Sequence, residues 1–249
     1  MNQAMKLKRY KGERLSLLFS LFLVLCFYYL IFGISSLLFF LALIFQLFYI
    51  LVSQRQLIGN TLQVSERQFE DIYKVAQDNA KDLNIKMPRI FIVQDPYLNA
   101  FTIGFKSPYA IVLTSSLVES LTKDEIDFVI GHEMGHIKFG HSKILSFISP
   151  LGKDIPFVSW LYAFWQRKAE YTADRVGFFV VKEIRPTISA MLKMTVGKKL
   201  STLIDIEGII EQIEESRDGI LSRTGELLLT HPYVTNRIRA LSEYDYFER

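Results

Sequence analysis

The most extended feature of the hydrophobic pattern is an uninterrupted apolar run near the start of the chain. From Leu15 to Ser53 there is no Asp, Glu, Lys, Arg or His. As one helix this run would be about 58 Å long, whereas about 30 Å is enough to cross the hydrocarbon core of a bilayer. The polar break at 33–36 divides the run near its middle. The pattern therefore predicts a transmembrane helical hairpin, with two spans at about 15–32 and 37–52 joined by a tight turn.

The run has two other interpretations besides the hairpin. One is a single tilted span followed by a buried helix. The other is a cleavable signal peptide, which is disfavoured because the run is too long and no small-residue cleavage site follows it.

After the apolar run, the pattern changes to short helices and strands. Apolar residues at helical spacing, preceded by a capping box of Ser65 and Gln68, predict a helix over 65–83. Residues after 160 are also mainly helical in pattern. Between these helical regions, β-rich stretches are predicted at 89–94, 98–104 and 109–114, the last two forming a hairpin. This order predicts an α+β fold that is mainly helical, with a small antiparallel sheet.

The segment 144–165 is ambiguous because it is strongly apolar but is interrupted by Pro150, Gly152 and Pro156. Each half has about ten residues, which is too short to span a bilayer. A pair of buried elements is the first interpretation. A membrane-surface segment with interfacial tryptophans is the second, and a third span is the last.

Charge is concentrated at the N-terminus. The formal net charge is +3, and the first 14 residues alone carry +4, so the remaining 235 sum to −1. A nucleic-acid-binding domain would carry its basic surplus on the folded domain, so we expect no nucleic-acid partner. The positive-inside rule places the basic 1–14 segment in the cytoplasm. Two crossings over 15–53 then return the chain to the cytoplasm, where 54–249 must fold as one domain.

Candidate chemistry is concentrated at His132-Glu-Met-Gly-His136, on a predicted helix that starts at a capping box of Thr122 and Glu125 and runs to about His141. Histidines four residues apart lie on one helix face and can bind one Zn²⁺ together. Glu133, beside the first histidine, can take a proton from a water that zinc has made more acidic. Because the chain has a single cysteine, Cys26, it can form neither an internal disulfide nor a thiolate-rich zinc site.

A third protein ligand is needed, with the fourth position open. The candidates are His141, His231 and a carboxylate. His141 would lie off the shared helix face, so we expect it to cap the helix end or face solvent. Glu170 is the stronger candidate, because Glu170 and Asp174 are again four residues apart and one carboxylate can orient a ligand histidine while the other binds the metal. The alternative for this pair is a solvated helix face.

The motifs from Gly131 to His141 and from Glu170 to Arg175 resemble the HtpX-like family of membrane zinc metallopeptidases, which are gluzincins related to the CAAX prenyl proteases. The resemblance covers about 65–241 and implies a zincin-type metallopeptidase domain after the hairpin. It also implies roles for five residues of the two motifs. These roles are ligation of one Zn²⁺ by His132, His136 and Glu170, general base catalysis by Glu133, and support of a ligand by Asp174.

The same resemblance gives meaning to two further segments. Asn99, Ala100 and Phe101 are similar to the family's edge strand, to which a substrate peptide adds as a further strand. His231, followed by Pro232 and Arg237, resembles a C-terminal motif whose histidine faces the cleft and stabilises the oxyanion. The alternative for His231 is a helix cap before Pro232.

The expected function is therefore a membrane-anchored zinc endopeptidase, in the plasma membrane of a bacterium, with its catalytic domain facing the cytoplasm. Its expected partners are the lipid bilayer and peptide or protein substrates, in particular membrane proteins. The resemblance implies a role in membrane protein quality control. Two alternatives are a dedicated processing protease, for example for a lipidated or signalling substrate, and a non-catalytic membrane scaffold with the same fold.

Overall fold

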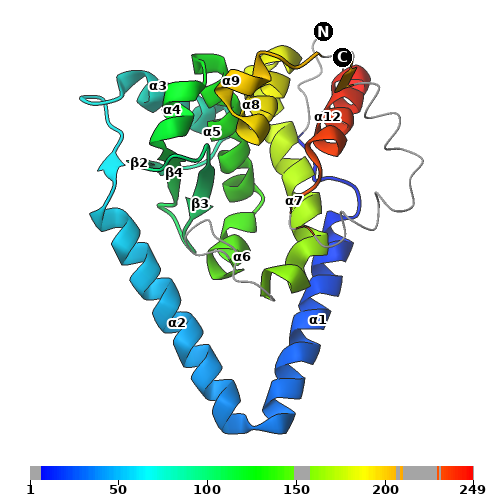
Figure 1. Ribbon diagram of the computed structural model, residues 1–249. Coiled ribbons are helices and arrows are strands. Elements are labelled where there is room, and N and C mark those ends of the chain that lie inside the picture. The colour runs from blue at the N-terminus through cyan, green and yellow to red at the C-terminus, as the bar shows by residue number, and fades with distance from the viewer. Residues whose placement is uncertain (1–6, 149–157, 206–207, 210–228, 230, 249) are drawn as a thin grey trace.

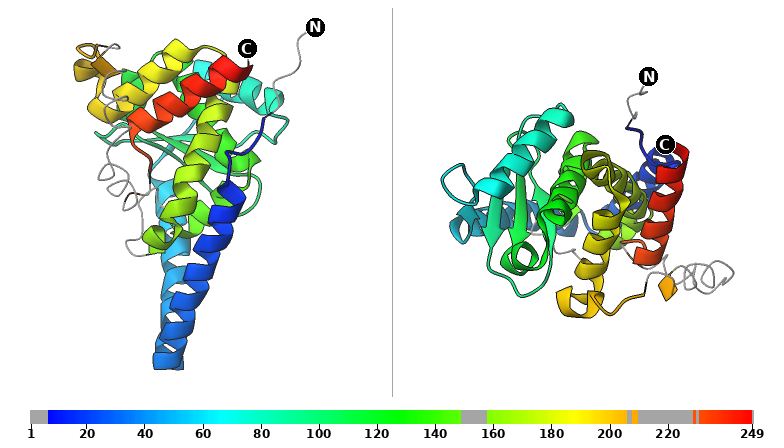
Figure 2. Two further views of the ribbon diagram at one scale, coloured as in Figure 1. Left: turned by 90° about the vertical axis from the view of Figure 1, so that its right-hand side faces the viewer. Right: turned by 90° about the horizontal axis from the view of Figure 1, so that it is seen from above.

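The computed structural model describes residues 7–148, 158–205, 208–209, 229 and 231–248. Two long helices, α1 (Glu13–Ile34) and α2 (Ser36–Gly59), meet at Ser35 and diverge toward a body that contains the sheet and the other helices (Figure 1). Seen from the side, the pair forms a narrow stalk below that body (Figure 2). The start of α1 and the end of α2 both lie at the body.

The break between the two apolar helices falls where the sequence predicts it. Ser35 has extended backbone, with φ −162° and ψ 117°, and it separates α1 from α2. Within the described residues, α1 is the one helix that is long and apolar enough to cross a membrane, and α2 contributes a shorter apolar stretch, Ser36–Tyr49. Many large apolar side chains of both helices are exposed, as lipid-facing residues would be. That both α1 and α2 cross a membrane remains a prediction.

The sheet is mixed, not antiparallel throughout as predicted. Its strand order is β1-β2-β4-β3, and the strands are β1 (Leu62–Gln63), β2 (Arg89–Val93), β3 (Ala100–Ile103) and β4 (Ala110–Thr114). The predicted hairpin of β3 and β4 is confirmed. However, β4 inserts between β3 and β2 and runs parallel to β2, because the chain passes to the sheet edge before it turns back.

The hydrophobic core lies mainly on one face of this sheet. Successive strand residues point to opposite faces. Accordingly, Ile111 and Leu113 face the main core, which is shared with α3 and α5, whereas Val112 belongs to a smaller cluster on the other face. This packing places β3 beside α5.

Helix α3 (Glu70–Asp82) begins later than the pattern predicts, and the predicted capping box of Ser65 and Gln68 is wrong. The backbone groups of these two residues bond to each other in both directions, at 3.0 and 3.1 Å. They therefore form a tight turn, and Phe69 in a left-handed conformation (φ 59°) precedes the helix instead.

The helices that carry the candidate chemistry follow β4. The short α4 (Ser115–Ser120) leads into α5 (Lys123–Lys138), whose capping box of Thr122 and Glu125 is confirmed. The chain then turns at Gly140, which has φ +77°, into α6 (His141–Ile148). The remaining described helices are α7 (Val158–Val181), α8 (Ile184–Val196), α9 (Lys198–Ser201) and α12 (Val234–Glu248).

The ambiguous segment 144–165 is helical in its described parts, at the end of α6 and the start of α7, and 149–157 lie outside the described residues. Tyr162 and Trp165 are buried against Leu17 and Val24 of α1. Trp160 on the same helix is 48% exposed. The described parts thus combine a buried face, which holds α1 against α7, with an exposed aromatic face.

Candidate active site

Small residues allow α5 and α7 to pack closely. A Cβ at Gly135 would lie 2.9 Å from the Cβ of Val176 and 3.1 Å from the Cα of Ala173. A Cβ at Gly177 would lie 2.7 Å from the ring of Phe128. Since real Cβ atoms essentially never approach other atoms to less than 3.0 Å, a larger residue at either position would force the helices or their side chains to shift. The glycines thus let the two helices approach closely enough for their side chains to share one site.

Three buried side chains converge between these helices: His132 and His136 from α5 and Glu170 from α7. The two histidine Nε2 atoms are 3.2 Å apart. The carboxylate of Glu170 lies 3.5 Å from His132 Nε2 and 3.4 Å from His136 Nε2. A tetrahedral ion bound at about 2.1 Å would separate its ligand atoms by about 3.4 Å, so the three donors fit a single metal ion such as Zn²⁺.

Asp174 and Arg237 support this cluster from behind. Asp174 Oδ1 lies 2.9 Å from His132 Nδ1, on the ring side opposite Nε2. Arg237 of α12 donates to both oxygens of Asp174, at 2.9 and 2.6 Å. Burial disfavours the charge of Asp174, but the guanidinium of Arg237 and the ring of His132 together outweigh burial, so the pKa of Asp174 lies below its usual value. The ring of His132 is thereby held by an anionic partner.

Two carboxylates make His132 a favourable place for positive charge. Burial opposes charge on this ring, but hydrogen bonds with Asp174 and Glu170 outweigh it and raise the pKa of His132 to about 10. The pKa of Glu170 lies well below its usual value, because the positive charge of His231 and hydrogen bonds from the histidines exceed the penalty of burial. Such a site favours a cation at this position, whether a proton or a metal.

Glu133 has a partner that sequence reasoning missed. The hydroxyl of Thr102, on β3, donates to Glu133 Oε2 at 2.7 Å and lies 3.2 Å from the Glu133 carbonyl oxygen. Both residues are buried. The signal in the sequence that could have indicated Thr102 is strand alternation. Alternation puts Thr102 on the same face of β3 as Ala100, which the sequence resemblance places next to the substrate.

His141 lies behind the cluster rather than in it. The earlier end of α5, at Lys138, brings His141 Nδ1 to 3.1 Å from His136 Nδ1. Its side chain is 1% exposed, so the expectation that it faces solvent is wrong. Its two ring nitrogens face the side chains of His136 and Glu13, so the expectation that it caps the helix end is wrong as well. Burial lowers the pKa of His141 to about 4, and the ring is therefore neutral near pH 7.

His231 lies at the rim of the cluster. Its Nδ1 is 3.5 Å from Glu170 Oε2, and its side chain is 63% exposed. Since α12 begins at Val234, the alternative in which His231 caps a helix starting at Pro232 does not apply. The structure thus places His231 next to Glu170, and its role toward an oxyanion stays a prediction.

The segment Asn99–Phe101 leads into β3 at the edge of the sheet. Ala100 and Phe101 pair with Leu113 and Val112 of β4. Thr114 N donates to the carbonyl of Asn99 at 3.0 Å, which extends this pairing by one residue. Among the described strands, none pairs with the other edge of β3, so its outward backbone groups could accept a further strand.

Comparison with known proteins relates both motifs to peptidases. The sequence profile of peptidase family M48 matches residues 66–157 and 151–245. The plastoglobule-localized metallopeptidase 48 of Arabidopsis thaliana, a chloroplastic protein, is 29% identical over 208 residues, which cover 75% of this chain and 60% of that protein. An HtpX protease homologue of Helicobacter acinonychis is 27% identical over 220 residues, which cover 74% of this chain and 69% of that protein.

Among solved structures, the crystal structure of Ste24p from S. mikatae is similar, with 19% sequence identity and a TM-score of 0.48. The similarity covers 82% of this chain and 56% of that one. The chain therefore spans only part of the length of these relatives, 60% in the case of the Arabidopsis protein.

Proposed function

Because this chain belongs to peptidase family M48, we propose that it is a membrane-anchored, zinc-dependent endopeptidase. Membership agrees with the resemblance to HtpX-like membrane zinc metallopeptidases that the two motifs indicate. The observation that carries the proposal is the convergence of His132, His136 and Glu170 on one point between α5 and α7. Glu133, next to the first of these histidines in the sequence, supplies the base that peptide hydrolysis requires.

We assign His132, His136 and Glu170 as the ligands of a single Zn²⁺. Two imidazoles and one carboxylate suit zinc, whereas Mg²⁺ and Ca²⁺ prefer oxygen ligands throughout. Three protein ligands leave one position open, which is the arrangement of catalytic rather than structural zinc sites. When bound, zinc would polarise the scissile carbonyl and make a water molecule more acidic.

The residues of the chain itself carry the proton transfers. Glu133 takes a proton from the attacking water and delivers it to the leaving amine. The hydrogen bond from Thr102 orients the Glu133 carboxylate for this role. The substrate backbone adds to the outer edge of β3, next to Asn99, Ala100 and Phe101. His231, at the exposed rim, donates a hydrogen bond to the oxyanion.

We further propose that α1 and α2 cross the membrane as a hairpin, with the catalytic body in the cytoplasm of a bacterium. The excess of basic residues before α1 supports this orientation. A peptidase held at this surface would meet damaged or misassembled membrane proteins, so its role is membrane protein quality control.

The test of the catalytic proposal is cleavage of casein, an unfolded and unrelated protein, by the detergent-purified enzyme with zinc. We expect the wild type to cleave and Glu133→Gln to be slower by about 10²- to 10⁴-fold, the usual contribution of a general base. A chelator abolishes cleavage, and added zinc restores it. Glu66→Gln, at an exposed glutamate outside the site, is the matched control and keeps wild-type activity.

Two results would contradict this proposal in different ways. Equal cleavage by the wild type and Glu133→Gln points to a contaminating protease and removes the assignment of Glu133. Cleavage by neither protein, although both bind zinc, favours a dedicated processing protease or a non-catalytic scaffold.

A further inference from the structure

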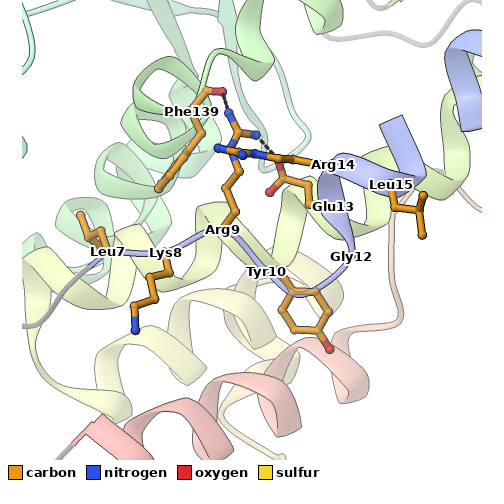
Figure 3. A pocket seen from close by; sticks show the side chains of 9 residues that line it. All are labelled: Leu7, Lys8, Arg9, Tyr10, Gly12, Glu13, Arg14, Leu15 and Phe139. Atoms are coloured by element: carbon orange, nitrogen blue, oxygen red, sulfur yellow. Dashed lines mark hydrogen bonds and ion pairs between the residues drawn. The ribbon is translucent and has the colours of Figure 1, made fainter. Parts of the chain in front are cut away.

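The residues before α1 form a strap, Leu7–Gly12, that lies against the catalytic body (Figure 3). Arg9 donates to the carbonyl oxygen of Phe139, at the end of α5, and pairs with Glu13. The amide of Tyr10 donates to Thr172 Oγ1 of α7 at 2.8 Å. The strap also borders a cavity of about 560 Å³, whose lining includes none of the three metal-competent residues. The strap is therefore hydrogen-bonded to both helices of the site, through Arg9 to the end of α5 and through Tyr10 to α7.

Glu13, the first residue of α1, is 1% exposed. Its Oε1 lies 3.0 Å from His141 Nε2 and also accepts from Arg9. Its Oε2 accepts from the hydroxyl of Thr172. A buried carboxylate at the entrance of an apolar helix is costly unless it is fully hydrogen-bonded, and here each oxygen has a partner.

These contacts join Glu13 to a metal-competent histidine through one imidazole. His141 Nε2 faces Glu13, and His141 Nδ1 faces His136 Nδ1 at 3.1 Å. The remaining nitrogen of His136, Nε2, points to His132 and Glu170. Glu13, His141 and His136 thus form a continuous chain of hydrogen bonds that ends at the metal-binding cluster.

The direction of each hydrogen bond follows from the donor inventory. An ionised carboxylate only accepts, so His141 Nε2 is the donor toward Glu13. A neutral imidazole with a proton on Nε2 has an acceptor at Nδ1, so His136 Nδ1 is the donor in the next bond. His136 Nε2 is then left without a proton, and a lone pair at Nε2 is what a metal ion requires.

The same atoms offer a competing arrangement that would block metal binding. Arg9 Nη1 lies 3.3 Å from His141 Nε2 and could donate to it. His141 would then carry its proton on Nδ1, and His136 would carry its own on Nε2. The carboxylate of Glu13 prevents this, because it accepts from Arg9 and from His141 Nε2 at once.

We propose that Glu13 is a positioning residue of the metal site, which acts through His141 to hold His136 with Nε2 available to the metal. This inference rests on the proposed function, in which His136 is a ligand of the metal. It also makes the first residue of the membrane anchor part of the structure that prepares the catalytic site.

The test is the zinc affinity of detergent-purified full-length protein, measured by competition with a chelator in the inactive Glu133→Gln background. Outer partners of ligand histidines are typically worth 10- to 100-fold in metal affinity, so we expect Glu13→Ala to weaken zinc binding by that factor. Glu13→Gln keeps one acceptor oxygen, so we expect this variant to retain most of the zinc affinity that Glu13→Ala loses. Arg14→Gln, at the exposed neighbouring position, is the matched control and leaves the affinity unchanged.

A double-mutant cycle with His141→Ala tests the route of this effect. If Glu13 acts through His141, Glu13→Ala weakens zinc binding by less than about threefold when it is introduced into the His141→Ala variant. Additive losses overturn the proposal, and so does a Glu13→Ala variant that unfolds at a lower temperature but binds zinc as tightly as its parent. If the parent protein itself binds no zinc, the proposed function fails, and the role of Glu13 fails with it.

Discussion

At the scale of single residues, Thr102 has the most direct influence on the proposed base. Its hydroxyl is 2.7 Å from Glu133 Oε2, and both side chains are buried. Thr102→Val keeps the shape of the side chain and removes the donor. Hydrogen bonds to charged groups contribute about 1.5–3 kcal/mol, so we expect kcat for casein cleavage to fall by about tenfold or more, with little change in KM.

The matched control for this variant is Thr102→Ser, which keeps the hydroxyl and loses only a methyl group. It should retain kcat within about threefold of the wild type. An unchanged kcat in Thr102→Val, measured by initial rates at saturating casein, would show that Glu133 does not depend on this hydrogen bond.

Residue spacing explains which site residues were predictable. His132 and His136, and likewise Glu170 and Asp174, are pairs four residues apart, so one helical turn places each pair on one face. By contrast, Thr102 lies 31 positions from Glu133, and Glu13 lies 128 positions from His141. No local pattern encodes such contacts, because they arise only when strand, anchor helix and core helices pack together.

At the scale of elements, the start of α5 depends on Glu125. Its carboxylate accepts from the amide of Thr122, from Ser189 at 2.6 Å and from Lys193 at 2.7 Å, and so joins α5 to α8. Burial would raise the pKa of Glu125, but Lys193, Ser189 and Thr122 outweigh it and lower the pKa below the ordinary value of 4.5. The charged form is thus favoured by folding, and this stability is lost as the pH falls from 4.5 through the folded pKa.

We therefore expect Glu125→Gln to lower the unfolding midpoint at pH 7 by about 4–8 °C, which corresponds to about 2 kcal/mol for a domain of this size. The difference from the wild type should shrink as the pH is lowered below 4.5. Thermal unfolding of the purified protein at pH 7 and pH 3 measures both points. Glu119→Gln, at an exposed position on α4, should match the wild type at each pH, and a Glu125→Gln deficit that persists at pH 3 would contradict the assignment.

The elements themselves were predictable where the signal is local. The capping box of Thr122 and Glu125 marks the start of α5 because the two residues satisfy each other's backbone groups. Ser65 and Gln68 have the same spacing, but there the backbone groups bond directly, so side-chain identity alone misleads. The parallel pairing of β2 and β4 was missed for another reason, since strand order depends on contacts beyond the hairpin.

At the scale of the whole molecule, α1 packs directly against the body. Leu17 and Val24 of α1 pack against Tyr162 and Trp165 of α7, the helix that carries Glu170. The ring of Phe19 meets that of Phe164 edge-on, with centroids 5.7 Å apart. The start of α1 and the end of α2 both lie at the body, and their junction lies at the far tip (Figure 1). A hairpin that crosses the membrane therefore exposes its tip on the side opposite the body.

Labelling of single cysteines tests this arrangement, in a Cys26→Ser background expressed in bacterial cells. Ser36→Cys lies at the exposed tip of the hairpin, and Glu66→Cys lies on the exposed surface of the body. A maleimide that cannot cross membranes should label Ser36→Cys in intact cells and Glu66→Cys only after the membrane is opened, because the basic N-terminus favours the cytoplasm for both ends of the hairpin. The reverse pattern would show the opposite orientation. If both positions react only in opened cells, the tip does not reach the outer face, and the apolar helices lie within or along the membrane without crossing it.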